Sequence, residues 1–372
     1  MKLNMKPSKK IIIDSAIPFI KGVFEPYFNV EYYKGSEFTR QIIEDADALV
    51  VRTRTKCNSS LLDGSNVKFI ATATIGEDHI DKEYCAANGI TVRNAAGCNA
   101  GGVLQYVFTA LYSLSVLKGF SLPPFLPDKK LVLGVIGVGN VGSRVADFAE
   151  RLGFEVLKND PHRMEEMIGC SGRVEDGYVQ LDELLERSDI VTLHTSLNST
   201  SKGLASSAFF KKMKKGAIFV NASRGEVMDE EALAAYSDKL GGIIIDVWNN
   251  EPNISLKTLS IADFHTPHIA GYSLEGKING TTMSVHNVAD YFGIDELKSF
   301  AVDESQFVPA KVIEFGKIIK MKDCREAGKI IAQKLLESYD IKSDSAALGK
   351  NPADFELLRN SYNYRREFVA EW

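Results

Sequence analysis

The stretch LVLGVIGVGNVGS, residues 131–143, decides the fold of this 372-residue chain. Its apolar first half is typical of a buried strand in a parallel sheet. Gly137, Gly139 and Gly142 then form the pattern G-x-G-x-x-G, which alone is a weak signal because glycine is common. The residues that follow carry apolar side chains on one helical face, at Val141, Val145, Phe148, Ala149 and Leu152. The stretch therefore predicts a strand, a tight glycine turn and a helix.

This succession predicts a dinucleotide site. The first glycine permits the turn, the second lets the backbone approach a pyrophosphate, and the third allows close packing of helix on strand. Asn140 and Val141 begin the helix, whose N–H groups and dipole would face the phosphates. Asp160 ends the next strand, where its carboxylate can bind ribose hydroxyls and favours NAD over NADP. His162 and Arg163 nearby leave NADP open, and the alternative is a glycine turn without a nucleotide.

Apolar runs alternate with helical patterns along most of the chain, which predicts an α/β protein with parallel sheets. Before residue 100 the predicted strands lie in KIIIDSA, ADALVVRTRT, VKFIATATIG and GITVRNAAG. NAGGVLQYVFTALYSLSVL, residues 99–117, predicts a long apolar helix, and SLPPFLPDKK a linker. The later strands lie in GFEVLKND, DIVTLHTS, GAIFVNASRGE, GGIIIDVW and DFHTPHIAG. The final stretch, DFELLRNSYNYRREFVAEW, is expected to be helical.

Composition excludes several classes of protein. A net charge of -5 and a pI near 5.8, with scattered Lys and Arg, argue against a nucleic-acid partner. No stretch approaches the roughly 18 to 20 uncharged apolar residues of a membrane span, and MKLNMKPSKK is interpreted as a basic extension rather than a signal peptide. Five widely spaced cysteines without C-x-x-C argue against a disulfide framework or a metal site. A cytoplasmic protein is expected.

Polar residues follow three of the predicted strands, at the edge where parallel sheets bind ligands. Arg224 follows IFVNAS, Asp246 and then Glu251 follow III, and His268 follows FHTP. An arginine can hold a substrate carboxylate by two hydrogen bonds, and a histidine can remove a hydroxyl proton as a hydride leaves. A carboxylate behind the histidine would fix its tautomer. These residues together suit oxidation of a 2-hydroxy acid.

Each of these residues also has a structural interpretation. Arg224 could belong to a surface ion pair, and Glu251, before a proline, could be a solvated turn residue. Among the histidines, His268 is the expected catalytic residue. The remaining histidines considered are expected to be packed residues: His79, His194, His265 and His286.

Four motifs, GVGNVGS, ASRGE, DVWNNEP and HTPHIAGYSLEGK, resemble the D-isomer-specific 2-hydroxyacid dehydrogenases. Other stretches resemble a branch of that family that oxidises 4-phospho-D-erythronate with NAD in pyridoxal 5'-phosphate synthesis. They are VRTRTKCNSSLL, ATATIGEDHID, AAGCNA, GYSLEGKINGTTM and DFELLRNSYNYRREF. The resemblance covers nearly the whole chain.

The resemblance implies a role for each matched residue. The implied catalytic residues are Arg224, Glu251 and His268. The implied NAD contacts are Gly137, Gly139, Asn140, Val141, Gly142, Asp160, Thr195, Ser223, Asp246 and Gly271. The implied substrate contacts are Thr53, Thr74 and Tyr272.

It also implies two doubly wound parallel-sheet lobes and a small α+β C-terminal domain. The flavodoxin-like substrate lobe comprises residues 1–101 and 270–291, the Rossmann NAD lobe residues 102–269, and the dimerisation domain residues 292–372. A homodimer without a bound metal is expected. Three features depart from the family pattern: Asn249 and Asn250 in DVWNNEP, Gln105 where glutamate is frequent, and an end soon after RREF.

Several alternatives stay open at the level of sequence. Strand alternation in VRTRTK would place Thr53 and Thr55 on the face towards the substrate, with Arg52 and Arg54 either solvated or bound to its phosphate. Activity on 3-phosphoglycerate would use the same fold. An NAD-sensing scaffold without activity is the alternative from another class.

Overall fold

A computed structural model describes residues 8–124 and 130–372. The chain divides into two compact units: unit 1 is Met1–Asn99 with Leu274–Val308, and unit 2 is Ala100–Ser273 with Pro309–Trp372. Residues 1–7 of the expected extension and 125–129 of the expected linker lie outside the described residues.

Unit 1 is built on a five-stranded parallel sheet with the order β2-β1-β3-β4-β5. This order is that of flavodoxin-like folds and confirms the predicted class. The strands are β1 (Lys10–Asp14), β2 (Asn29–Tyr33), β3 (Ala48–Val51), β4 (Phe69–Thr72) and β5 (Thr91–Asn94). The sequence analysis missed β2, a half-buried edge strand whose residues NVEYY do not form an apolar run.

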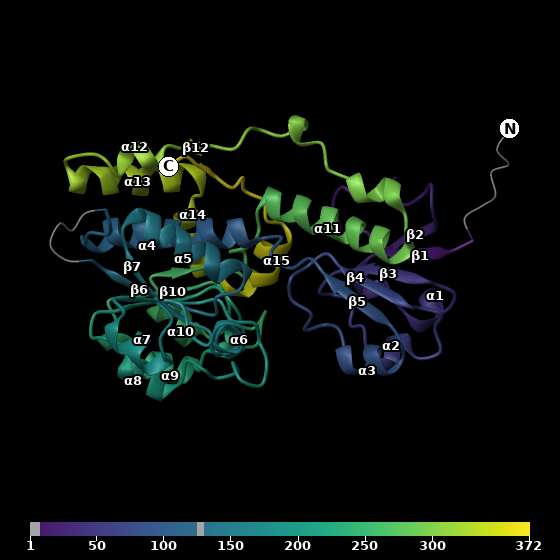
Figure 1. Cartoon of the computed structure of the whole chain (residues 1–372), viewed down its shortest axis with the longest axis horizontal. Coiled ribbons are helices and arrows are strands. Elements are labelled where there is room, and N and C mark those ends of the chain that lie inside the picture. Colours follow the sequence, from purple (N-terminus) through teal and green to yellow (C-terminus); the bar gives the residue numbers. More distant parts are fainter. Residues whose placement is uncertain (1–7, 125–129) are drawn as a thin grey trace. The chain divides into compact units, whose positions relative to one another are not determined.

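Helices cover both faces of this sheet (Figure 1). The helix α11 (Leu274–Phe292) and the 3-10 helix η4 (Asp295–Ser299) pack on one face, where Val285, Val288 and Leu297 meet the apolar side chains of β1, β3 and β4. The other face carries the short helices α1 (Arg40–Ile43), α2 (Ser59–Leu62) and α3 (Lys82–Ala87). Unit 1 thus has three layers, with its own core on each side of the sheet.

Unit 2 is built on a six-stranded parallel sheet with the order β11-β10-β9-β8-β6-β7. The strands are β6 (Val132–Ile136), β7 (Glu155–Asn159), β8 (Ile190–Leu193), β9 (Ile218–Asn221), β10 (Gly242–Ile245) and β11 (Phe264–His265). Tyr178 adds an isolated parallel bridge to Lys158 of β7, in the place of the third strand in the 3-2-1-4-5-6 order of dinucleotide-binding sheets. The order reverses between β6 and β8, which places the glycine turn after β6 at the switch point.

Two apolar cores lie on the two faces of this sheet, as Figure 1 shows for α4 and α5 above it and α7, α8 and α9 below it. The α-helices of unit 2 that precede β11 are α4 (Ala100–Lys118), α5 (Asn140–Leu152), α6 (Pro161–Ser171), α7 (Leu181–Arg187), α8 (Ser207–Lys212), α9 (Glu230–Tyr236) and α10 (Leu256–Ile261).

Helix α4 corrects one expectation from composition. In the described part of the chain it is the helix long and apolar enough to cross a membrane, by length and composition alone. However, 78% of that apolar stretch is buried. Tyr106, Phe108 and Leu111 lie in the core of unit 2 against α5 and the sheet. Its apolar character is thus explained by packing in the core of unit 2.

The C-terminal residues pack onto the same core as α4. Their elements are β12 (Val312–Ile313), α12 (Phe315–Ile318), α13 (Cys324–Ser338), α14 (Ile341–Lys350), α15 (Phe355–Asn360) and β13 (Val369–Ala370). Phe315, Ile331 and Leu335 are fully buried there. The compact units divide at Val308, so residues 292–308 belong to unit 1. A dimerisation domain from residue 292 stays a prediction.

The expectation of a helical tail is wrong beyond Asn360. From Ser361 the chain is held by tertiary contacts: Arg365 forms a β-bridge with Ser273, and β13 pairs with β12. These contacts replace the hydrogen bonds that a longer helix would have made.

Candidate active site

Three neighbouring strands of unit 2 present polar side chains at their carboxyl ends. Arg224 follows β9, Asp246 follows β10 directly, and His268 follows β11. Gly225 is required here because a Cβ on it would lie 2.1 Å from the carbonyl carbon and oxygen of Trp248, so the loops after β9 and β10 pack backbone against backbone. The fold therefore brings together side chains that lie far apart in the sequence.

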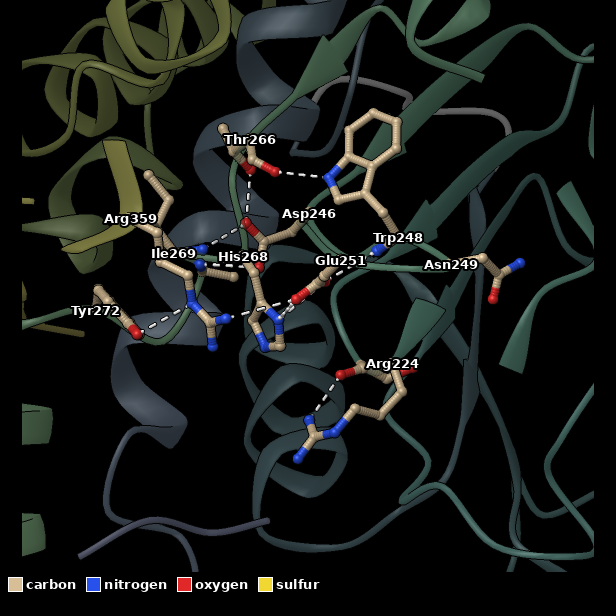
Figure 2. A network of polar contacts seen from close by, with 12 residues as sticks. Arg224, Asp246, Trp248, Asn249, Glu251, Thr266, His268, Ile269, Tyr272 and Arg359 are labelled. Atoms are coloured by element: carbon tan, nitrogen blue, oxygen red, sulfur yellow. Dashed lines mark hydrogen bonds and ion pairs between the residues drawn. The ribbon is translucent and has the colours of Figure 1, made fainter. Parts of the chain in front are cut away.

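His268 and Glu251 form a close pair (Figure 2). The Nδ1 atom of His268 lies 3.0 and 2.8 Å from the two carboxylate oxygens of Glu251. Because an ionised carboxylate only accepts hydrogen bonds, we assign the proton to Nδ1. The lone pair of the neutral ring is then on Nε2, which can act as a base.

Two further groups hold Glu251. The backbone N–H of Trp248 donates to Oε1 at 3.1 Å, and Nη1 of Arg359 lies 3.5 Å from Oε2. Burial by itself would raise the pKa of Glu251, but the charge and hydrogen bond of His268, with Arg359 and the Trp248 N–H, outweigh it and lower the pKa below its usual value. Glu251 is therefore ionised near neutral pH.

Asp246 holds the turn that carries His268. Its carboxylate accepts hydrogen bonds from the backbone N–H of Ile269 at 2.8 Å and of Ala270 at 2.9 Å, and from the Thr266 hydroxyl at 2.6 Å. His268 itself has φ 57°, in the left-handed region that residues with a side chain rarely adopt. Burial raises the pKa of Asp246, against the effect of His268 and these three donors. The predicted contact of Asp246 with NAD stays a prediction.

Arg224 lies beside this pair on the loop after β9, as Figure 2 shows. Its Nη1 donates to the carbonyl of Ser223 at 2.8 Å. The buried side chain of Asn221 shapes the loop, since it accepts from the N–H and hydroxyl of Ser223 and donates to the carbonyl of Arg224. Ser223, a predicted NAD contact, is itself buried.

The glycine turn fits the pyrophosphate of a dinucleotide. Gly137 has φ 84°, and a Cβ on it would lie 2.8 Å from the backbone of His194. A Cβ on Gly142 would lie 1.9 Å from the carbonyl oxygen of Gly137, so helix and strand pack closely. A Cβ on Gly139 would meet no described atom within 4 Å, which leaves space for a phosphate at the N-terminus of α5, where Asn140 and Val141 follow.

Other predicted NAD contacts lie around this turn. The hydroxyl of Thr195 is buried without a hydrogen-bond partner among the described residues, so a ligand group can bind it. Asp160 caps α6 by accepting from the N–H of Arg163 at 3.2 Å, and it also accepts from the N–H of Val138 at 2.8 Å. Gly271 lies in the turn after His268 and is partly buried. The individual NAD contacts stay predictions.

Tyr272 meets the C-terminal segment, a contact that the sequence analysis did not anticipate. Nε of Arg359 donates to the Tyr272 hydroxyl at 3.2 Å. Arg365 donates to the carbonyls of Ile269, Ala270 and Tyr272, which belong to the turn after His268, and to Gly102 of α4. Only the motif DFELLRNSYNYRREF signalled these arginines, and it assigned no role to either.

Gln105, which departs from the family pattern, also contacts this segment. Its oxygen accepts from Nε of Arg365 at 3.3 Å, and its nitrogen donates to the Ser338 hydroxyl and the Arg366 carbonyl, both at 3.1 Å. Asn249 and Asn250 fit their turn: Asn250 has φ 58°, which asparagine tolerates, and Asn249 donates to the Met228 carbonyl.

Thr53 and Thr74 lie in unit 1, and their predicted substrate contacts stay predictions. The expected alternation in VRTRTK is wrong, because β3 ends at Val51 and the chain turns. Thr53 is exposed, whereas Thr55 is 1% exposed and donates to the Gly35 carbonyl. The hydroxyl of Thr74 donates to the Gly76 carbonyl and lies 2.7 Å from that of Thr72.

The remaining histidines considered make structural contacts. In unit 2, burial lowers the pKa of His194 to about 3, so its ring is neutral. His265 ends β11, burial lowers its pKa, and its ring lies against Gly349. In unit 1, the rings of His79 and His286 lie near the Thr72 hydroxyl and the Phe300 carbonyl.

Comparison with known proteins identifies the family. Residues 126–270 match the model of the D-isomer specific 2-hydroxyacid dehydrogenase NAD binding domain. The chain is 42% identical over 365 residues to the erythronate-4-phosphate dehydrogenase of Bacteroides fragilis, across 96% of this chain and 97% of the relative. It belongs to the erythronate-4-phosphate dehydrogenase family. The corresponding protein of Escherichia coli O157:H7 is 37% identical, across 97% of this chain and 93% of the relative.

Solved structures with the same fold are those of related NAD enzymes. D-lactate dehydrogenase from Aquifex aeolicus, complexed with NAD and lactic acid, has a TM-score of 0.64 and 28% identity, covering 79% of this chain and 99% of its own. The NAD-bound 3-phosphoglycerate dehydrogenase of Entamoeba histolytica has a TM-score of 0.62 and 28% identity, covering 80% and 99%. This erythronate-4-phosphate dehydrogenase family member is therefore an NAD-dependent dehydrogenase with a small hydroxy acid as substrate.

Proposed function

We propose that this enzyme oxidises the C2 hydroxyl of 4-phospho-D-erythronate to give (R)-3-hydroxy-2-oxo-4-phosphooxybutanoate, a step of pyridoxal 5'-phosphate synthesis. The observation that carries the proposal is the His268–Glu251 pair, with Nδ1 2.8 Å from the carboxylate, beside Arg224 at the strand ends of the NAD-binding unit. The relatives with this name match nearly the whole chain.

His268 removes the proton of the C2 hydroxyl through Nε2. The ring becomes an imidazolium as the hydroxyl oxygen becomes a carbonyl oxygen, and the ionised Glu251, 2.8 Å from Nδ1, stabilises that charge. In the reverse direction, the same Nε2 atom returns the proton. NAD, when bound, supplies the hydride acceptor.

Arg224 orients the substrate. Its guanidinium can pair with the substrate carboxylate through two parallel hydrogen bonds, and its positive charge favours the carbonyl that forms at C2. Because Arg224 pairs with the substrate carboxylate, the enzyme would bind a 2-hydroxy acid in preference to a neutral alcohol.

The resemblance to the family implies Thr53, Thr74 and Tyr272 as further substrate contacts. Hydroxyl groups can donate to or accept from the phosphate and hydroxyl groups of the acid. We also propose that the enzyme is a homodimer, as the resemblance to its family implies, and that it acts in the cytoplasm, as its widely spaced cysteines favour.

The test is NAD reduction at 340 nm by the purified full-length chain with three acids: 4-phospho-D-erythronate, 3-phospho-D-glycerate and unphosphorylated D-erythronate. A parallel reaction contains a 2-keto acid as acceptor, in case reduced cofactor stays bound. We expect the highest kcat/KM with 4-phospho-D-erythronate. Preference for 3-phospho-D-glycerate would contradict the substrate assignment and leave the dehydrogenase chemistry intact.

Inactivity with all three acids, together with NAD binding, would contradict the proposed activity and favour an NAD-sensing scaffold. Binding is therefore measured independently, by titration calorimetry with NAD and NADP. Weaker binding of NADP is expected, because the carboxylate of Asp160 would repel a phosphate on the ribose.

A further inference from the structure

Arg359 contacts two residues of the proposed site at once (Figure 2). Its Nη1 lies 3.5 Å from Oε2 of Glu251, and its Nε donates to the Tyr272 hydroxyl at 3.2 Å. Its guanidinium also lies over the Tyr272 ring, 5.9 Å from the centroid. We propose that Arg359 is a positioning residue of this active site, which fixes Glu251 as the partner of His268 and orients the hydroxyl of Tyr272. The proposal rests on the catalytic roles given above to His268 and Glu251.

The surroundings of this ion pair distinguish it from a solvated surface pair. The side chains of Arg359 and Glu251 are 26% and 19% exposed. Surface ion pairs contribute little because water screens them and both side chains lose mobility. Here the Trp248 N–H and His268 already contact the Glu251 carboxylate, so the ion pair with Arg359 costs little further side-chain mobility. Arginine suits this role because its planar guanidinium presents Nε and Nη1 in fixed directions.

Helix α15 holds Arg359 in place. Phe355, at the start of the helix, is 1% exposed and lies in the apolar core of unit 2. After the helix, Arg365 donates to the carbonyls of Ile269, Ala270 and Tyr272. The C-terminal segment is thus attached on both sides of Arg359, and it holds the turn that carries Tyr272.

The contact with Tyr272 fixes the direction of its hydroxyl. Nε of Arg359 is always a donor, so the Tyr272 oxygen accepts, and the hydroxyl proton points away from Arg359. Arg359 would therefore link the acid/base pair to a substrate contact through a single guanidinium.

The contact with Glu251 determines the charge around His268. Among the described residues, Asp246, Arg359 and Arg224 are charged groups around this pair, and Tyr272 contacts Arg359. Removing the positive charge of Arg359 leaves the two carboxylates to favour the imidazolium. The acidic limb of the pH profile for kcat/KM should then move to higher pH, because the neutral ring is the base.

The experiment compares Arg359→Met, Arg359→Lys and the parent enzyme, with Arg325→Met as a matched control on the exposed surface of α13. For Arg359→Met we expect kcat to fall about 10- to 100-fold, KM for the acid to rise about 3- to 10-fold, and the acidic limb to move up by about 0.5 to 1 pH unit. Arg359→Lys should restore the position of the limb but only part of kcat, because an ammonium keeps the charge without the two fixed donors. Arg325→Met should match the parent.

A double-mutant cycle with Tyr272→Phe tests the second contact. The rise in KM caused by Arg359→Met should largely disappear in the Tyr272→Phe background, since the hydroxyl that Arg359 orients is absent. Equal effects of Arg359→Met in both backgrounds would overturn the proposed orientation of Tyr272.

A spectroscopic readout separates this proposal from the proposed function. The proton on Nδ1 of His268, held by a carboxylate, should give a downfield proton resonance that is absent in His268→Ala. Arg359→Met should broaden or shift that resonance, and Arg325→Met should leave it unchanged, whatever the substrate proves to be. An unchanged resonance, or a loss of activity that follows only the unfolded fraction with an unmoved pH profile, would overturn the positioning role.

Discussion

The carboxylate of Asp246 accepts hydrogen bonds from the backbone N–H groups of Ile269 and Ala270, at 2.8 and 2.9 Å. The N–H of His268, just before them, donates to the Asp246 carbonyl at 2.8 Å. Asp246, on the neighbouring strand end, therefore makes three hydrogen bonds to the strained backbone around His268, which has φ 57°. Backbone strain of this kind costs on the order of 1 to 3 kcal/mol and persists where other contacts fix it. Asp246 provides those contacts.

Replacement of Asp246 by asparagine should therefore affect both stability and turnover. The amide has one acceptor oxygen, so at least one of the three donors around it loses its partner in a buried place. We expect a loss of about 2 to 4 kcal/mol in unfolding free energy and a lower kcat at temperatures where the protein stays folded. Denaturant unfolding and NAD reduction measure the two effects.

The matched control for Asp246→Asn is Thr266→Val, which removes one of the donors and keeps the carboxylate. It should cost about 1 to 2 kcal/mol, with kcat close to the parent value. Equal stability of Asp246→Asn and the parent would contradict the role of Asp246 in holding the turn.

His268→Ala tests the base directly. We expect kcat to fall about 10³-fold with NAD affinity unchanged, because the ring removes the proton but lies on a different loop from the glycine turn. His265→Ala is the control from the same strand end: it removes a ring that packs against Gly349, so it should lower stability and leave kcat of the folded protein near normal. Comparable turnover of His268→Ala and the parent would exclude His268 as the base.

The pH dependence of stability tests the state of Glu251. Because its pKa in the folded protein is below the usual value near 4.5, ionised Glu251 stabilises the fold above pH 4.5, and this contribution is lost as the pH falls through the lower folded pKa. The difference in unfolding free energy between the parent and Glu251→Gln should thus be largest above pH 4.5 and shrink below it. Both tryptophans, Trp248 and Trp372, lie in unit 2 and report its unfolding by fluorescence. A difference that grows on acidification would contradict the ion pairs of Glu251.

The positions of Arg224 and Asp246 at strand ends could be predicted because β9 and β10 are short, mostly apolar runs. Asp246 follows β10 directly, and Arg224 follows β9 after two residues. The glycine turn was equally clear, since strand, spacing and helix agree. These features depend on contacts within about ten residues of sequence, where local pattern carries the information.

Other features depend on distant contacts and could not be predicted. Arg359 reaches Glu251 across 108 residues of sequence, and no local pattern distinguishes it from a solvated helical arginine. The turn after Val51 is fixed by Thr55, whose hydroxyl donates to Gly35, and by Arg52, whose guanidinium donates to Ala16. Alternation of polar residues in VRTRTK gave no sign of either contact, so a strand was expected where the chain turns.

That turn separates the roles of two threonines. Thr53 is exposed and is a predicted substrate contact, so Thr53→Ala should raise KM for the acid about 5- to 20-fold and leave stability within about 0.5 kcal/mol. Thr55 is buried, so Thr55→Val should cost about 1 to 3 kcal/mol with an unchanged KM. A raised KM in Thr55→Val with normal stability would reverse this assignment and restore the alternation first expected.

The glycine turn offers the sharpest contrast between stability and cofactor binding. In Gly142→Ala the new Cβ would lie 1.9 Å from the carbonyl oxygen of Gly137, which is backbone and cannot rotate away. Helix α5 must shift, and we expect a loss of about 2 to 4 kcal/mol in stability even without NAD.

In Gly139→Ala the new Cβ meets no described atom within 4 Å, so the free energy of unfolding of the apoprotein should stay within about 1 kcal/mol of the parent value. The methyl group would instead occupy the space for the pyrophosphate, and the Kd for NAD should rise about tenfold or more, which is at least about 1.4 kcal/mol. Thermal unfolding without NAD and titration calorimetry with NAD measure the two quantities separately. Unaltered NAD affinity of a folded Gly139→Ala variant would show that the pyrophosphate does not bind at this turn.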